Sequence, residues 1–177
     1  MRAQRPVIIG WSLAVLEALA YVKLHGDGRH AGLVLVDNSV GEEPPPSSKY
    51  DIVAALRRDR EATVRGFVRS MFRTPQSDAY LEDLTRQALR TPLDQSIALL
   101  SWPWPRGEWR AALYATSRPV LYVVTPQFAA QAANVHRHRP DIAVEVFKDA
   151  GHALFVDRAE RFNAVLERFL GRLAAAR

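Results

Sequence analysis

The segment Val7-Ile8-Ile9-Gly10-Trp11-Ser12-Leu13-Ala14 is the stretch from which the fold of this chain can be inferred. A short β-branched run ends in a glycine, and a long apolar stretch follows directly after the serine. The pattern predicts a buried strand over residues 6–10 and a helix over residues 12–25. Ser12 would lie on the turn between them, with its hydroxyl exposed at a helix N-terminus, where free N–H groups stabilise an anion.

A second strand completes a strand–helix–strand unit at the start of the chain. The helix over residues 12–25 is apolar on every side, which is typical of a buried helix. Residues 31–37 form a continuous apolar run, as expected of a parallel sheet that is covered on both faces. The same kind of run recurs over residues 119–124 and 142–147, and Asp157 with Glu160 predicts a capping-box start for a last amphipathic helix.

The region between the second and third predicted strands has a different character. Glu42-Glu43-Pro44-Pro45-Pro46 is rich in proline, and the pattern from about residue 49 to 115 is helical without clear strands. This insertion is far longer than an ordinary connection between a strand and a helix. We therefore predict an α/β fold with a mostly parallel sheet of about four strands. Residues 1–42 and 116–177 would form its core and residues 43–115 a helical cap.

Composition narrows the class of protein. The chain has 177 residues, of which 48% are hydrophobic, and this indicates one soluble globular domain. The absence of cysteine excludes disulfides, thiolate metal sites and cysteine nucleophiles. No membrane span and no signal peptide are predicted, so the cytoplasm is the default expectation for localisation.

The net charge of +5 raises the question of a nucleic-acid partner. Six arginines gather between Arg57 and Arg73, but the acidic residues Asp51, Asp59 and Glu61 are interleaved with them. Nucleic-acid footprints are clustered and unopposed, so we expect a solvated helix face and no nucleic-acid partner.

His152 is the residue best placed to activate Ser12. Serine is a weak nucleophile until a base takes its proton, and a third group must orient that base. His152 lies in a Gly-His turn just after the strand over residues 142–147, and parallel strands end at the same edge of a sheet. The alternative is a solvated loop histidine without a catalytic role.

Taken together, these motifs resemble the α/β-hydrolase superfamily, and within it the esterase and cofactor-free haloperoxidase-like branch. The resemblance rests on Gly10-Trp11-Ser12-Leu13-Ala14, the strand ending at Asp37, the helical insertion, the strand ending at Val124 and Asp149-Ala150-Gly151-His152. It implies a hydrolase that attacks carboxylic esters or related small acyl substrates through an acyl-enzyme on Ser12. No cofactor is expected. A serine at this position disfavours dehalogenase and epoxide-hydrolase chemistry, which use a carboxylate nucleophile.

The acid of the implied catalytic triad is displaced from its usual place. The family usually carries it just after the strand that here ends at Val124, where Thr125-Pro126-Gln127-Phe128 holds no carboxylate. Some members carry it one strand earlier, and that position is Asp37. Asp37 could instead end its strand in a simple turn, which is a common role. Asp149 lies too near His152 in the chain, and Asp141 precedes a strand and so faces the other edge.

The resemblance also implies the remaining site residues. The Leu13 backbone N–H would be one oxyanion donor. Apolar residues that could contact substrate are Trp11, Phe67, Met71, Trp102 and Phe155. Apolar residues at helical spacing more often pack in a core, so the packing alternative stays open for the residues of the insertion.

Other ligands are not favoured by the motifs. Gly10 is the only glycine of its turn, so no dinucleotide cradle is predicted. His136 and His138 have no suitable carboxylate or third histidine nearby in the sequence, so no metal site is expected.

Finally, the nucleophile follows the first strand here, whereas in the superfamily it follows the fifth of about eight. The resemblance thus implies that four strands and the loop bearing the second oxyanion donor are absent, and loss of one such donor costs ~10²–10³ in rate. Val7-Ile8-Ile9 would be an apolar edge strand, which favours association. Three possibilities stay open: a longer parent enzyme, completion by another chain, and a weakly active or inactive fragment that acts as an interaction module through this edge. The edge strand could also pair two copies in a homo-oligomer.

Overall fold

The computed structural model describes residues 5–46, 50–101 and 103–175. The chain divides into two compact units. The sheet unit comprises Met1–Pro46, Trp104–Lys148 and Ala159–Arg177, and the helical unit comprises Ser47–Pro103 and Asp149–Arg158.

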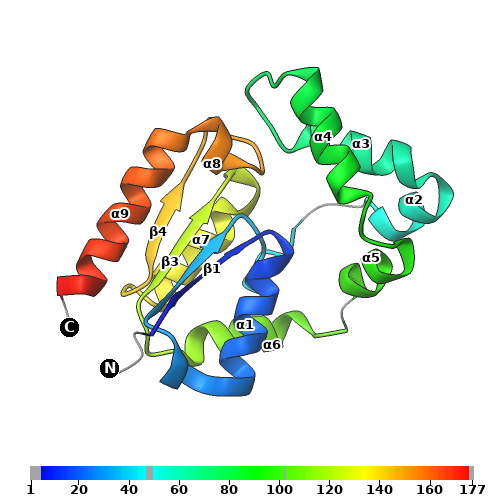
Figure 1. Cartoon of the computed structure of the whole chain (residues 1–177). Coiled ribbons are helices and arrows are strands. Elements are labelled where there is room, and N and C mark those ends of the chain that lie inside the picture. Colours follow the sequence, from blue (N-terminus) through cyan, green and yellow to red (C-terminus); the bar gives the residue numbers. More distant parts are fainter. Residues whose placement is uncertain (1–4, 47–49, 102, 176–177) are drawn as a thin grey trace. The chain divides into compact units, whose positions relative to one another are not determined.

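The described part of the sheet unit is built on one parallel sheet with the strand order β1-β2-β3-β4 (Figure 1). Its strands are β1 (Val7–Trp11), β2 (Gly32–Val36), β3 (Val120–Val124) and β4 (Ala143–Val146). Its α-helices are α1 (Leu13–His25), α6 (Arg106–Ala115), α7 (Ala129–His138) and α9 (Ala159–Ala175). The predicted α/β class with about four parallel strands is confirmed.

Helices cover the two faces of this sheet. One core cluster joins side chains of α1, α6 and α7 to alternate residues of the strands, among them Leu33, Leu35 and Tyr122. The opposite face receives α9, whose Leu173 and Phe169 side chains pack on Gly32. One face of α9 is buried through Phe162, Val165, Phe169 and Leu173, as the predicted amphipathic last helix requires, whereas Leu170 is 38% exposed.

The strands differ in burial according to their place in the sheet. All residues of β2 and β3 are buried, as their continuous apolar sequences predict. In contrast, β1 lies at one edge, and Ile9 at its centre is 50% exposed although it pairs with the fully buried Val34. An apolar strand edge of this kind is an association hazard.

The helical unit contains α2 (Ile52–Arg58), α3 (Arg60–Ser70), α4 (Asp78–Ala88), α5 (Leu93–Leu100) and the short α8 (Leu154–Asp157). Side chains cap three of these helices: Asp51 accepts from Ala54 N–H, Asp59 from Ala62 N–H and Ser77 from Tyr80 N–H. Such caps satisfy N–H groups that have no partner within the helix.

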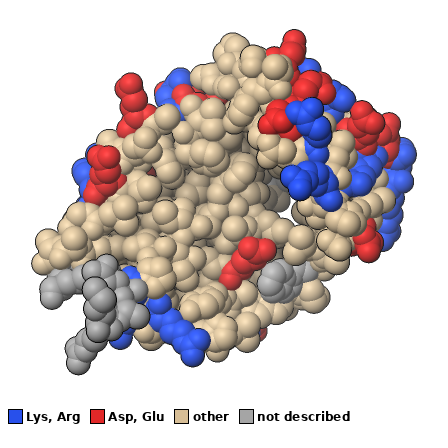
Figure 2. Space-filling view, viewed as in Figure 1, with Lys and Arg blue, Asp and Glu red and all other residues tan. Residues whose placement is uncertain are grey.

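Several arginines of the helical unit pair with carboxylates. Arg65 contacts both Glu61 and Glu82, and Arg86 contacts Asp83. Figure 2 shows Lys and Arg interleaved with Asp and Glu on the charged part of the visible surface. These pairs are the interleaving that the sequence pattern predicts, and exposed pairs of this kind contribute little to stability.

The two units divide the chain at places that differ from the predicted domain boundaries. The helix α6, placed with the cap by its sequence pattern, packs in the sheet unit. Residues 149–158, placed with the core, belong to the helical unit. Within the described residues, no helix is long and apolar enough to cross a membrane.

His30, just before β2, is an unusual buried residue. Its side chain is completely buried, and neither ring nitrogen has a hydrogen-bond partner within the described parts of the chain. Asp27 Oδ1 lies 3.6 Å from His30 Nε2, too far for a hydrogen bond. Burial lowers the pKa of His30, and the charge of Asp27 offsets only part of that effect.

His30 should make the protein sensitive to mild acid. A histidine whose pKa is lower in the folded state loses stability as the pH falls below its unfolded value of about 6.5. We expect the free energy of unfolding to decline below that pH, by at most about 1.4 kcal/mol per pH unit for one proton. His30→Leu should flatten this decline, and His25→Leu, at an exposed position, should not. Urea titrations at several pH values measure the free energy of unfolding of the wild type and the two variants. The prediction would be contradicted if that free energy changed equally with pH in all three proteins.

Candidate functional site

Ser12 occupies a sharp turn between β1 and α1. Its backbone has φ 55° and ψ −126°, a conformation that costs a non-glycine residue about 1–3 kcal/mol. The Ser12 N–H donates to Val36 O at 2.9 Å, and Asn38 Nδ2 donates to Ser12 O at 2.8 Å. The Ser12 side chain makes no capping bond to α1, although serine is a favoured cap. Backbone strain at a residue that does not cap its helix points to a functional role.

The turn is tight because α1 packs directly against β1. A Cβ atom at position 10 would lie 2.4 Å from the carbonyl oxygen of Ala14, so only glycine fits there. Leu13 is the first residue of α1, and N–H groups in the first helical turn have no acceptor within the helix. The strand, the turn and the helix are therefore arranged as the opening segment predicts.

Asp37 lies next to this turn, directly after β2. It is 1% exposed and has a positive φ of 50°. Its N–H donates to Val123 O at 2.8 Å, and its Oδ1 accepts a 2.7 Å hydrogen bond from Thr125 N–H. The carboxylate therefore reaches the end of β3, where the family pattern usually has its acid and this chain has Thr125.

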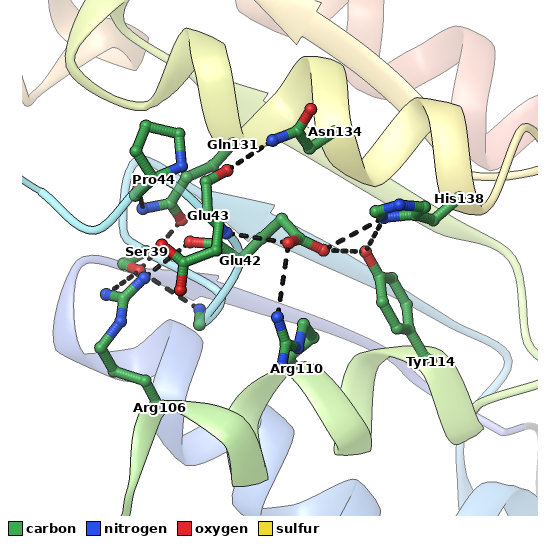
Figure 3. Close-up of polar contacts among 11 residues, drawn as sticks. Ser39, Glu42, Glu43, Pro44, Arg106, Arg110, Tyr114, Gln131, Asn134 and His138 are labelled. Atoms are coloured by element: carbon green, nitrogen blue, oxygen red, sulfur yellow. Dashed lines mark hydrogen bonds and ion pairs between the residues drawn. The ribbon is translucent and has the colours of Figure 1, made fainter.

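The segment after Asp37 is held by a polar network that the sequence reasoning missed (Figure 3). Ser39 Oγ donates to Gln131 Oε1 at 3.0 Å and accepts from Arg106 Nη1 at 3.0 Å. Gln131 Nε2 in turn donates to Pro44 O at 2.9 Å, and Asn134 Nδ2 to Glu43 O at 2.8 Å. These contacts tie the chain that leaves β2 to α6 and α7.

Glu42 is the charged centre of the network. It is 2% exposed, accepts from the Tyr114 hydroxyl and from the Glu43 N–H, and lies 3.7 Å from Arg110. Burial raises the pKa of Glu42, but the hydrogen bonds from Tyr114 and Glu43 outweigh it and the pKa is lowered. The acidic pair that follows Gly41 was the sequence signal for this network. A Cβ atom at Gly41 itself would lie 2.1 Å from Arg106 O, so the backbone there packs closely against α6.

His152 belongs to the helical unit, whereas Ser12 and Asp37 belong to the sheet unit. Its ring meets that of Phe67 edge-on, with 6.1 Å between centroids. The next residue, Ala153, donates its N–H to Met71 O at 2.8 Å. The loop that carries His152 is thus attached to the end of α3.

The predicted substrate-contacting residues fall into the same two groups. Trp11 and Leu13 flank Ser12 and are half-buried. Phe67 is 42% exposed and Met71 is 7% exposed in the helical unit, where Phe155 is half-buried. Trp102 lies outside the described residues.

The described residues contain no cluster of three or more potential metal ligands. His136 Nδ1 lies 3.3 Å from the backbone oxygen of Ile142. No carboxylate lies near His138 in the sequence, but the fold brings Glu42 Oε2 to 3.5 Å from its Nδ1. The network after β2 brings Glu42 close although it is far from His138 in sequence.

Solved structures with the same fold include several enzymes. An esterase from Exiguobacterium antarcticum is 17% identical with a TM-score of 0.80, and the match covers 96% of this chain and 68% of that one. A bromoperoxidase from Bacillus anthracis is 18% identical with a TM-score of 0.77, covering 95% and 68%. A candidate aryl esterase from Burkholderia cenocepacia is 24% identical with a TM-score of 0.79, covering 98% and 66%.

The chain therefore spans about two thirds of the length of these structures. Identities this low show a shared fold alone. No curated protein sequence matches the chain. The sequence over residues 2–165, which is most of the chain, matches the alpha/beta hydrolase family. The parallel sheet and the strained serine turn agree with this match. The chain therefore belongs to the alpha/beta hydrolase family.

Proposed function

We propose that this chain is a serine hydrolase that cleaves carboxylic esters or related acyl compounds through an acyl-enzyme on Ser12. The observation that carries the proposal is the backbone of Ser12, with φ 55° on a strand-to-helix turn beside the buried carboxylate of Asp37. Membership of the alpha/beta hydrolase family supports hydrolysis. The esterases among the solved structures of the same fold favour an ester substrate.

The proposed reaction proceeds in two steps. His152 removes the hydroxyl proton as Ser12 Oγ attacks the acyl carbon, and the alcohol leaves with that proton. The Leu13 N–H stabilises the negative oxygen of the tetrahedral intermediate. His152 then takes a proton from water, which attacks the acyl-enzyme, and returns that proton to Ser12 Oγ as the bond to the acyl carbon breaks and the carboxylic acid leaves. Asp37 holds the imidazole in the required orientation.

The substrate proposed here is small and at least partly apolar. Trp11, Phe67, Met71 and Phe155 supply apolar surface for an acyl or alcohol group. Phe67 favours this role because its ring is 42% exposed and contacts the His152 ring. The assignment of Trp102 to the same surface stays a prediction.

A second candidate function is association through the edge of the sheet. Ile9 favours it, since an aliphatic side chain at the centre of the apolar strand β1 is 50% exposed. Unpaired strand edges are templates for pairing with another chain. In this alternative, a second copy of the protein would cover β1, with or without hydrolysis at Ser12.

The role of Ser12 is tested by a fluorophosphonate probe, which reacts with activated serines. We expect stoichiometric labelling of the wild type at Ser12, located by peptide mass spectrometry, and none in Ser12→Ala, because alanine has no nucleophile. Ser39→Ala is a matched control, since this buried serine belongs to the polar network and should leave labelling unchanged. Equal labelling of the wild type and Ser12→Ala would contradict the enzyme proposal.

The role of Asp37 is tested by paired substitutions. Asp37→Asn keeps an oxygen for the Thr125 N–H, so we expect native stability with a loss of about 10²–10⁴ in hydrolysis of p-nitrophenyl acetate. Asp37→Ala leaves the Thr125 N–H without that acceptor and should also lose about 1–3 kcal/mol of stability. Asp141→Asn, at an exposed carboxylate paired with Arg139, is the control. A wild-type rate of hydrolysis in Asp37→Asn would contradict the catalytic role and leave Asp37 only the structural role of ending its strand in a turn.

The association candidate is tested by the mass of the protein in solution. We expect a concentration-dependent dimer of the wild type by sedimentation equilibrium and a monomer for Ile9→Lys, because a charged side chain blocks edge pairing. Leu24→Lys, at an apolar residue of α1 that is 68% exposed, should leave the dimer intact. A wild type that stays monomeric at high concentration would rule out pairing through β1.

A further inference from the structure

The loop that carries His152 is fastened to the helical unit at a close contact. A Cβ atom at Gly151 would lie 2.6 Å from Met71 O, so the backbone of this loop touches the backbone at the end of α3. The Ala153 N–H donates to the same Met71 oxygen at 2.8 Å. His152 is therefore flanked on both sides by residues that contact the chain after α3.

Asp157 holds these two segments together. Its Oδ2 accepts from Gly151 N–H at 2.7 Å and from Arg73 N–H at 2.8 Å. Its Oδ1 accepts from Thr74 N–H at 3.0 Å and from the Thr74 hydroxyl at 2.5 Å. The carboxylate is thus bonded to the His152 loop on one side and to the turn after α3 on the other. The capping-box pattern of Asp157 with Glu160 gave no sign of these bonds.

The charge state of Asp157 suits this role. The residue is 7% exposed. Burial raises its pKa, but the hydrogen bonds from Thr74, Gly151 and Arg73 outweigh that effect and the pKa is lowered. Hydrogen bonds to an ionised carboxylate are roughly twice as strong as neutral ones. The four donors therefore form a rigid junction around one buried charge.

We propose that Asp157 is a positioning residue, which fixes His152 by clamping Gly151 to the Arg73–Thr74 turn. This inference rests on the proposed function, in which His152 is the base. It adds that the helical unit carries the base while the sheet unit carries Ser12 and Asp37. The turn after α3 would then contribute to catalysis by holding the imidazole through Asp157.

The central test is Asp157→Asn, which has nearly the same shape but one fewer acceptor oxygen. We expect kcat for p-nitrophenyl acetate to fall about 10–100-fold with KM little changed, since misplacing a catalytic group slows the chemical step. Asp157→Glu, which restores the charge, should recover part of kcat. Asp78→Asn, an exposed carboxylate of the same unit that pairs with Arg69, should behave as the wild type.

Amide hydrogen exchange provides a readout that is independent of activity. The N–H groups of Gly151, Arg73 and Thr74 should exchange faster in Asp157→Asn, while those within α3 and α4 keep their protection. Thr74→Val removes only the hydroxyl donor, so it should give smaller changes in the same direction. This milder variant replaces Asp157→Asn if the latter fails to fold.

The outcomes separate the two proposals. Faster exchange at Gly151 with wild-type kcat would overturn the positioning role and leave the chemistry of Ser12 intact. Unchanged exchange at Gly151 in Asp157→Asn would overturn the clamp itself. A wild-type protein that does not react at Ser12 would overturn the proposed function, whatever the amides show.

Discussion

The close packing of α1 against β1 at Gly10 is the constraint on which the candidate site depends. Because no side chain fits between Gly10 and the Ala14 carbonyl, the chain must reverse direction within the turn, and Ser12 takes a strained backbone conformation. Hydrogen bonds from the Ser12 N–H to Val36 and from Asn38 to the Ser12 carbonyl hold that strain. The free energy of packing and of these hydrogen bonds therefore offsets the backbone strain at Ser12.

Around that turn, polar groups are fixed by bonds between distant segments. Asp37 reaches across to Thr125 at the end of β3, and the Glu42 network anchors the following segment to α6 and α7. In the helical unit, Asp157 does the same for the loop of His152. Glu42 and Asp157 are buried carboxylates with several hydrogen-bond donors, which is the condition under which a buried charge can rigidify a structure.

The sheet unit is stable where the strands are covered and vulnerable at the edge. β2 and β3 are buried along their whole length, whereas Ile9 of β1 is half-exposed. The chain spans about two thirds of the length of its structural neighbours. The proposed association and the proposed hydrolysis both involve β1, the strand that leads into the serine turn.

Local patterns in the sequence were sufficient for the strands, the serine turn and the family, because strand burial and the need for glycine at position 10 act over a few residues. They also indicated Asp37 as a candidate, but not its bond to Thr125. The Glu42 network, the attachment of α6 to the sheet unit and the hydrogen bonds of Asp157 were decided by tertiary structure. They involve contacts between residues far apart in the sequence: the Arg106 side chain donates to the Glu42 carbonyl, 64 residues away, and the Asp157 carboxylate accepts from the Arg73 N–H, 84 residues away. No local periodicity encodes such pairings, since they arise only when the packed elements bring those residues together.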